Sequence, residues 1–143
     1  MYGLNVLQKT QQSERSRQWA SWPTVRVRIE TDADIVLARQ QSKVIATALQ
    51  FSPTDSAFIA TTVSELARAL LSHTVRGEIW LHKVHEDDRN GVIIVARDPV
   101  GSDPELPEVF RLVDEFDVAS DAGRGTTIRA AKWCRRRSRV TGD

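Results

Sequence analysis

Hydrophobic and charged residues alternate strictly where the regular pattern of the chain begins. Val25, Val27 and Ile29 are apolar, and each is followed by a charged residue. A period of two is typical of a β-strand with one buried and one solvated face. The sequence therefore predicts a strand from Thr24, at the edge or outer part of a sheet.

Apolar residues then recur at helical spacing in two successive segments. Residues 31–34 offer hydroxyl and carboxylate caps for a first helix that we expect to end near Gln50. For the second helix, Ser52 suits the N-cap and Pro53 the first position, and the Asp55 carboxylate can reach back to the cap amide. The two apolar stripes are Ile35, Ala38, Ser42, Ile45 and Leu49, and then Ile59, Val63, Leu66 and Leu70, ending near His73.

The following segment is typical of a β-hairpin. Residues 78–84 alternate between apolar and polar, and residues 92–96 are continuously apolar. Asn90-Gly91 lies between them and is a strong turn signal. The sequence predicts two antiparallel strands, of which the second is central.

The last third of the chain predicts a loop, a short helix and two more strands. Three prolines in residues 99–107 indicate the loop. The short helix carries Val109, Leu112, Val113 and Phe116 on one face. The strands lie around Val118 and from Thr126 to Trp133, joined by residues 121–125.

This order of elements predicts an α/β (α+β) two-layer sandwich, in which helices cover one face of an antiparallel or mixed sheet. We expect one domain over residues 24–134, preceded by a flexible arm over 1–23 and followed by a basic tail over 135–143. Trp19 and Trp22 are unusual in a solvated arm, and they either fold back onto the domain or dock on a partner.

Composition narrows the function classes. The 143 residues are 41% hydrophobic and 27% charged, with a net charge of +1, so no overall field commits the protein to nucleic acid or membrane. A basic cluster at 135–139 is the feature that would favour nucleic acid, and a solvated tail explains it better. The single cysteine, Cys134, excludes an intrachain disulfide. Because no signal peptide or membrane-spanning run is found, we expect a cytoplasmic protein.

Several segments carry a family resemblance. The stretches 34–40, 59–68, 111–116 and 123–127, followed by Lys132-Trp133, resemble the RsbT-type serine kinases of bacterial stress signalling and the stressosome. These kinases and the related anti-sigma-factor kinases belong to the GHKL (Bergerat-fold, HATPase_c) ATPase superfamily. The resemblance implies that superfamily's mixed sheet with helices on one face.

The resemblance implies a catalytic glutamate on the second helix and, four residues later, an asparagine that binds magnesium. Residues four apart share one helix face and can point at the same triphosphate. This chain has Glu65 but Ala69, and a methyl group cannot bind a cation that requires oxygen ligands. Glu65 is therefore either the general base or a solvated carboxylate paired with Arg68 or Arg39, and the magnesium site is doubtful. His73, on the same face, is read as a helix-end residue without a chemical role.

The resemblance also implies an adenine-binding aspartate at the end of a strand, before a glycine-rich loop. Asp98 holds that position. Its carboxylate either accepts a hydrogen bond from the adenine amino group or caps a turn. Only one glycine, Gly101, follows within the loop, and residues 99–110 are too few to hold the family's lid and second glycine box. Gly125 and Thr126 resemble the residues that support adenine recognition, although Thr126 is equally typical of a strand.

The resemblance thus implies a retained adenine half and a missing phosphate half, with weak binding of ATP or ADP. Our leading hypothesis is a degenerate RsbT-like regulator that acts by binding a STAS-domain protein or sigma-factor regulator. The alternative is a slow ATP-dependent serine/threonine kinase acting on a STAS partner. A homodimer stays open, and neither a membrane nor nucleic acid is an expected partner.

Overall fold

The computed structural model describes residues 24–74, 76–100, 108–121 and 123–134. The predicted arm with Trp19 and Trp22, the loop around Gly101 and the basic tail lie outside the described residues. The elements are β1 (Val25–Ile29), α2 (Asp32–Ala48), α3 (Pro53–His73), β2 (Gly77–Glu86), β3 (Arg89–Asp98), the 3-10 turn η2 (Phe110–Leu112), β4 (Glu115–Asp121) and β5 (Gly125–Trp133).

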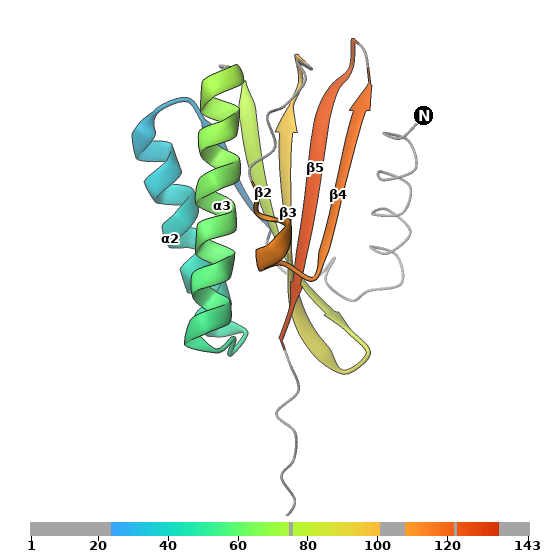
Figure 1. The fold of residues 1–143 in the computed structure, drawn as a ribbon. Coiled ribbons are helices and arrows are strands. Elements are labelled where there is room, and N and C mark those ends of the chain that lie inside the picture. Colours follow the sequence, from blue (N-terminus) through green and yellow to red (C-terminus); the bar gives the residue numbers. More distant parts are fainter. Residues whose placement is uncertain (1–23, 75, 101–107, 122, 135–143) are drawn as a thin grey trace, which may run out of the picture.

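These elements form two layers (Figure 1). The strands make one sheet in the order β1-β2-β3-β5-β4, and every pair of neighbouring strands that the structure describes is antiparallel. Helices α2 and α3 lie side by side on one face of the sheet. The two-layer sandwich is confirmed, the sheet is antiparallel rather than mixed, and β1 lies at an edge as predicted.

Both helices begin at the predicted caps. The Asp34 carboxylate accepts hydrogen bonds of 2.9 Å from the backbone amides of Glu30 and Thr31, and these bonds lower the pKa of Asp34. The Ser52 hydroxyl accepts a 3.1 Å hydrogen bond from the amide of Asp55. The Asp55 carboxylate lies 3.6 Å from Lys132 Nζ, so it joins α3 to β5, a contact that the sequence did not predict.

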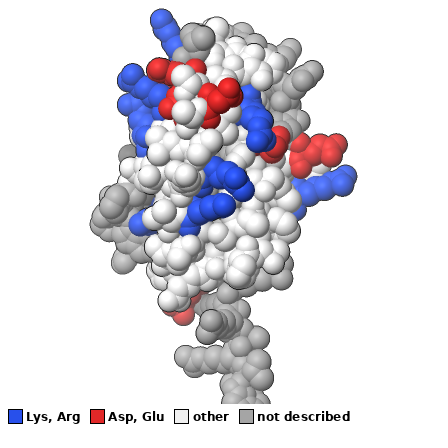
Figure 2. Space-filling model, turned by 90° about the vertical axis from the view of Figure 1, so that its left-hand side faces the viewer, with Lys and Arg blue, Asp and Glu red and all other residues white. Residues whose placement is uncertain are grey.

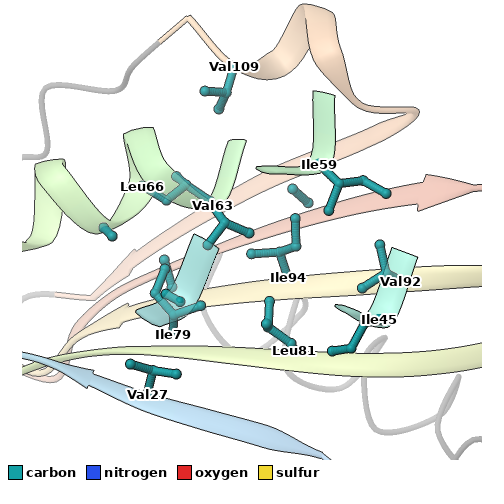
Figure 3. Packing of buried hydrophobic residues seen from close by; sticks show 14 of the residues in the cluster. Val27, Ile45, Ile59, Val63, Leu66, Ile79, Leu81, Val92, Ile94 and Val109 are labelled. Carbon is teal, nitrogen blue, oxygen red and sulfur yellow. The ribbon is translucent and has the colours of Figure 1, made fainter. Parts of the chain in front are cut away.

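The main core fills the space between the helices and the sheet (Figure 3). Ile59, Val63 and Leu66 of α3 point toward the sheet, where Ile79 and Ile94 meet them. All five side chains are at most 1% exposed. Because burying such a side chain contributes about 1.5–3 kcal/mol, this layer fixes the position of α3 on the sheet.

The hairpin turn differs from the prediction. It lies at Asp87 and Asp88, whose φ angles of 53° and 62° give a two-residue turn with both central residues left-handed. Asn90 and Gly91 lie inside β3. Gly91 is required there for packing, because a Cβ atom at this position would lie 2.5 Å from Cε3 of Trp133.

The predicted short helix over residues 109–116 is also wrong in part. Only Phe110–Leu112 forms a turn of 3-10 helix, and β4 begins at Glu115. The helical spacing of the apolar residues was misleading, because Phe116 and Val118 alternate along β4 and pack against the main core.

The face of the sheet opposite the helices holds a half-buried histidine. His82 on β2 stacks on Trp80, with ring centroids 6.4 Å apart. Burial lowers the pKa of His82 to about 4, because desolvation disfavours the imidazolium form. His82 is therefore neutral in the folded protein at neutral pH.

His82 should make the free energy of unfolding pH-dependent. Between pH 6.5 and 4 the unfolded chain protonates this histidine and the folded chain does not, so stability falls as the pH drops, by up to about 1.4 kcal/mol per pH unit. Urea unfolding at pH 7.5 and 5 measures the fall, which should be smaller in His82→Gln. His73→Gln, at the exposed end of α3, is the control and should leave the fall unchanged.

Candidate functional site

A small recess lies between α3 and the ends of β3 and β5. Its volume is about 20 Å³, enough for one or two water molecules and far below the roughly 300 Å³ of a typical small-molecule pocket. The residues that line it are Leu66, Ala69, Leu70, His73, Ala96, Asp98, Thr126 and Ile128. The sequence-predicted Asp98, Thr126 and Ala69 are thus brought together, in a recess that is nearly closed.

The polar groups of the recess come from the sheet. Asp98 is directly opposite Thr126 in the β3–β5 pairing, and both residues are buried, at 6% and 3% exposed. Asp98 Oδ1 accepts a 2.9 Å hydrogen bond from the amide of Val100, so this carboxylate caps the turn after β3. The Thr126 and Ser120 hydroxyls lie 2.8 Å apart. Asp98 therefore caps the turn through Oδ1, as one of the two interpretations expected. The same residue also lines the recess.

The helix side of the recess is mostly apolar. Leu66, Ala69 and Leu70 line it, and His73 lies at the exposed end of α3. Glu65 is not among the lining residues; its side chain is 41% exposed and bonded to Arg68 in the next helical turn. Of the two interpretations of Glu65, the structure shows the solvated carboxylate that pairs with an arginine. That arginine is Arg68 rather than Arg39.

Gly125 has a structural reason to be glycine. Its φ is +98°, and a Cβ atom there would lie 2.2 Å from the carbonyl oxygen of Asp98 and 2.9 Å from Cα of Pro99. The start of β5 therefore packs directly against the end of β3. Gly123 has a similar φ of +85° but no atom within 4 Å of its hypothetical Cβ.

At about 20 Å³ the recess is too small to hold an adenine ring, although its polar groups are of a kind that can hydrogen-bond one. Asp98 and Thr126 offer a carboxylate and a hydroxyl, the groups that hydrogen-bond an adenine ring. No oxygen ligand from α3 lines the recess, because Ala69 offers only a methyl group. In the described part of the chain, no group of three or more His, Cys, Asp or Glu residues is arranged to hold a metal ion.

Other lining residues were not singled out from the sequence. Ala96 and Ile128 lie two positions from Asp98 and Thr126 on their strands, and alternation places them on the same face. Leu66 and Leu70 were assigned to the core stripe alone. Once the pairing of β3 with β5 is known, the strand and helix periodicities predict that all four residues line the recess.

A larger hollow of about 540 Å³ lies at the same end of the sheet. Its described lining residues are Arg28, Glu30, Arg76, Gly77, Glu78 and Pro99. Glu78 is bound by Arg26 through two hydrogen bonds, which lower its pKa. Because Arg26 neutralises Glu78, the described lining leaves Arg28 and Arg76 beside Glu30 alone.

Comparison with known proteins adds an independent observation. No family model matches the chain. The serine/threonine-protein kinase RsbT of Bacillus subtilis (strain 168) is 38% identical over 127 residues, which cover 76% of this chain and 96% of that kinase. The chain belongs to the RsbT family. Identity at this level over nearly the whole relative supports the resemblance that the sequence motifs carry.

The extent of the match also locates a difference in length. Seventy-six per cent of 143 residues is about 109, whereas the match spans 127 positions, so about 18 positions of the RsbT kinase have no counterpart in this chain. The chain is thus a shortened member of the RsbT family within its matched region. None of the helices that the structure describes is long and apolar enough to cross a membrane.

Gly125→Ala should destabilise the fold more than Gly123→Ala. Both substitutions force alanine to a positive φ, at about 1–2 kcal/mol, but only Gly125→Ala also drives a Cβ atom into the backbone of Asp98. Overpacking adds about 1–3 kcal/mol to the loss. Urea unfolding followed by circular dichroism compares the two variants, and equal midpoints would contradict the close packing of β5 on β3.

Proposed function

We propose that this protein is a catalytically degenerate member of the RsbT family that regulates bacterial stress or sigma-factor signalling by binding a STAS-domain protein. In this proposal the GHKL-like site keeps its adenine-facing residues and has lost the parts that hold magnesium and phosphate. The protein then acts through its surface.

One observation carries the proposal. Ala69 stands four residues after Glu65 on α3, at the position where the resemblance implies a magnesium-binding asparagine, and it lines the recess beside Asp98. Phosphoryl transfer depends on a metal and on donors that stabilise the developing charge, since the transferred group itself needs little covalent help. A methyl group in place of an oxygen ligand removes the first of these.

The connection after Asp98 supports the proposal. Residues 99–109 alone join β3 to η2, and about 18 positions of the RsbT kinase have no counterpart in this chain. We assign this shortening to the lid of the family, whose backbone amides would surround the phosphates. Removing one preorganised donor of this kind typically raises a barrier by about 3 kcal/mol, and here several are absent together.

The outer surface of α2 is the best candidate for partner binding. Val36, Leu37 and Val44 are 54%, 43% and 64% exposed, and Arg39 is also exposed, on the other flank of the helix from Leu37 and Val44. Figure 2 shows this side of the molecule, where uncharged residues cover a wide area around a group of Lys and Arg. Exposed aliphatic residues grouped on one helix are typical of a protein-binding surface.

The alternative function is a slow ATP-dependent serine/threonine kinase. The observation in its favour is the direct pairing of Asp98 with Thr126 in the recess. In this case the recess would open to admit ATP, and Glu65 would leave Arg68 to act as general base. Phosphate transfer from labelled ATP to a serine of a STAS-domain protein, abolished by Glu65→Gln, would favour the kinase over the binding regulator.

We expect ATP and ADP to bind weakly and with similar affinity, and magnesium to change either affinity by less than about threefold. The reason is that the retained residues face adenine, whereas the γ-phosphate and the metal have no ligand from α3. Isothermal titration calorimetry with and without magnesium measures this. Asp98→Asn is the control and should abolish what binding there is; a strong magnesium-dependent preference for ATP would contradict the degenerate site.

Partner binding should depend on α2 and not on the recess. Arg39→Glu combined with Val44→Asp should weaken binding to a STAS-domain partner at least about tenfold, because both changes alter the exposed surface of α2. Glu65→Gln and Asp98→Asn should leave the affinity within about twofold. Binding is measured by biolayer interferometry on a panel of STAS-domain proteins.

A charge change elsewhere provides the matched control for that experiment. Arg97→Glu reverses an exposed arginine near the end of β3, away from α2, and should not affect the affinity. If the carboxylate variants lose the partner while the α2 variant keeps it, the nucleotide site governs binding and the proposal is wrong.

A further inference from the structure

The solvent side of α2 carries an uncharged stripe. The helix lies beside α3 on the sheet, and its outer side points away from both (Figure 1). At about 3.6 residues per turn, the side chains on this outer side form a stripe of Ala33, Leu37, Gln40, Gln41, Val44 and Ala48. The charged residues of α2 lie to either side of this outer stripe; they are Asp32, Asp34, Arg39 and Lys43. Because a helix on a protein surface normally turns its charges away from the core, the outer stripe has the character of a contact surface.

The outer stripe has the same order of residue types in both directions. About a midpoint between Gln40 and Gln41, the sequence places alanine at 33 and 48, an aliphatic residue at 37 and 44, and glutamine at 40 and 41. A two-fold axis through this midpoint, relating two antiparallel copies of α2, brings each position opposite its counterpart. Leu37 of each copy then meets Val44 of the other, and the glutamines meet at the axis.

The chemistry at the midpoint suits a second copy of the chain. A two-fold axis brings the residues beside it against their own copies, so a charge there would meet a like charge. Glutamine avoids this repulsion, because its amide group is both donor and acceptor and can bond to an identical amide. At the end of the stripe, Asp34 of one copy is level with Thr47 of the other, which keeps the two Asp34 carboxylates about 20 Å apart along the helices.

The length of α2 determines how strong this contact can be. Its 17 residues extend about 25 Å, and a pair of helices of this length buries less surface than the roughly 1,600 Å² of a standard protein interface. Interfaces at the small end of the range are typical of weak, transient complexes. We therefore expect a dissociation constant on the order of 10–100 μM.

We propose that the outer stripe of α2 is a self-association surface, through which two copies of this chain form a weak antiparallel dimer. The dimer does not rest on the proposed function. Its consequence for regulation does, since a second copy and a STAS-domain protein bound at α2 compete for the same side chains. In the free protein, a rising concentration then covers the surface that binds the partner.

Charge pairs across the two-fold axis test both the surface and its orientation. Sedimentation equilibrium of the full chain between about 1 and 500 μM measures the dissociation constant. Leu37→Lys and Val44→Glu should each weaken the dimer at least about tenfold, because each places a charge against an aliphatic side chain. The double variant should return to within about threefold of the original affinity, because the lysine at position 37 of one copy then faces the glutamate at position 44 of the other.

Arg39→Glu is the matched control for these variants. It reverses a charge on the same helix, but on the flank away from Leu37 and Val44, and should change the dissociation constant by less than about twofold. Circular dichroism checks that every variant is folded, which we expect because all the substituted side chains are exposed.

Three results would overturn the proposal. A chain that stays monomeric over the whole concentration range has no second copy at α2, and a dimer that survives both Leu37→Lys and Val44→Glu forms through another surface. A double variant as weak as the single variants would refute the antiparallel arrangement. A monomer that still binds a STAS-domain protein through α2 would refute the dimer and leave the proposed function standing.

Discussion

The antiparallel pairing of β3 with β5 is the constraint on which both faces of the sheet depend. At one end of this ladder Asp98 lies opposite Thr126, and Gly125 brings β5 against the carbonyl of Asp98. At the other end Gly91 lies opposite Trp133, and only a glycine leaves room for the indole. Two glycines, one near each end, thus allow the pairing that forms the recess on the helix face and the cluster on the other.

In the proposed regulator, the recess combines a retained part and an altered part of one site, and the two parts come from different layers of the fold. The sheet supplies Asp98 and Thr126, which the β3–β5 pairing holds in place whether or not a nucleotide binds. Helix α3 supplies Ala69, Leu66 and Leu70, which close the recess to about 20 Å³. In the proposed regulator, the sheet residues persist because they also cap a turn and pack the strands. The helix residues were free to lose their ligands.

The two faces of the molecule differ in how they meet solvent. On the helix side, α2 leaves Val36, Leu37 and Val44 exposed, which costs solubility unless a partner covers them. On the opposite side, Ile93 and Trp133 are almost completely buried. Of the five exposed large hydrophobic side chains among the described residues, three are therefore on α2.

The sequence by itself determined the elements whose causes are local. The alternation of Val25 to Ile29, the Ser52-Pro53 cap and the apolar stripe of α3 identified β1 and both helices with their ends, and the family motifs led to Asp98, Thr126 and Ala69. These features depend on residues close together in the chain.

Only the tertiary structure decided features that depend on distant residues. The turn at Asp87-Asp88 replaced the expected Asn90-Gly91 because Gly91 is needed under Trp133, forty-two positions further along the chain. The Asp55 carboxylate, expected at the helix cap, lies 3.6 Å from Lys132 Nζ on β5. In both cases the residue type allowed two local roles, and a contact between elements accompanies the one observed.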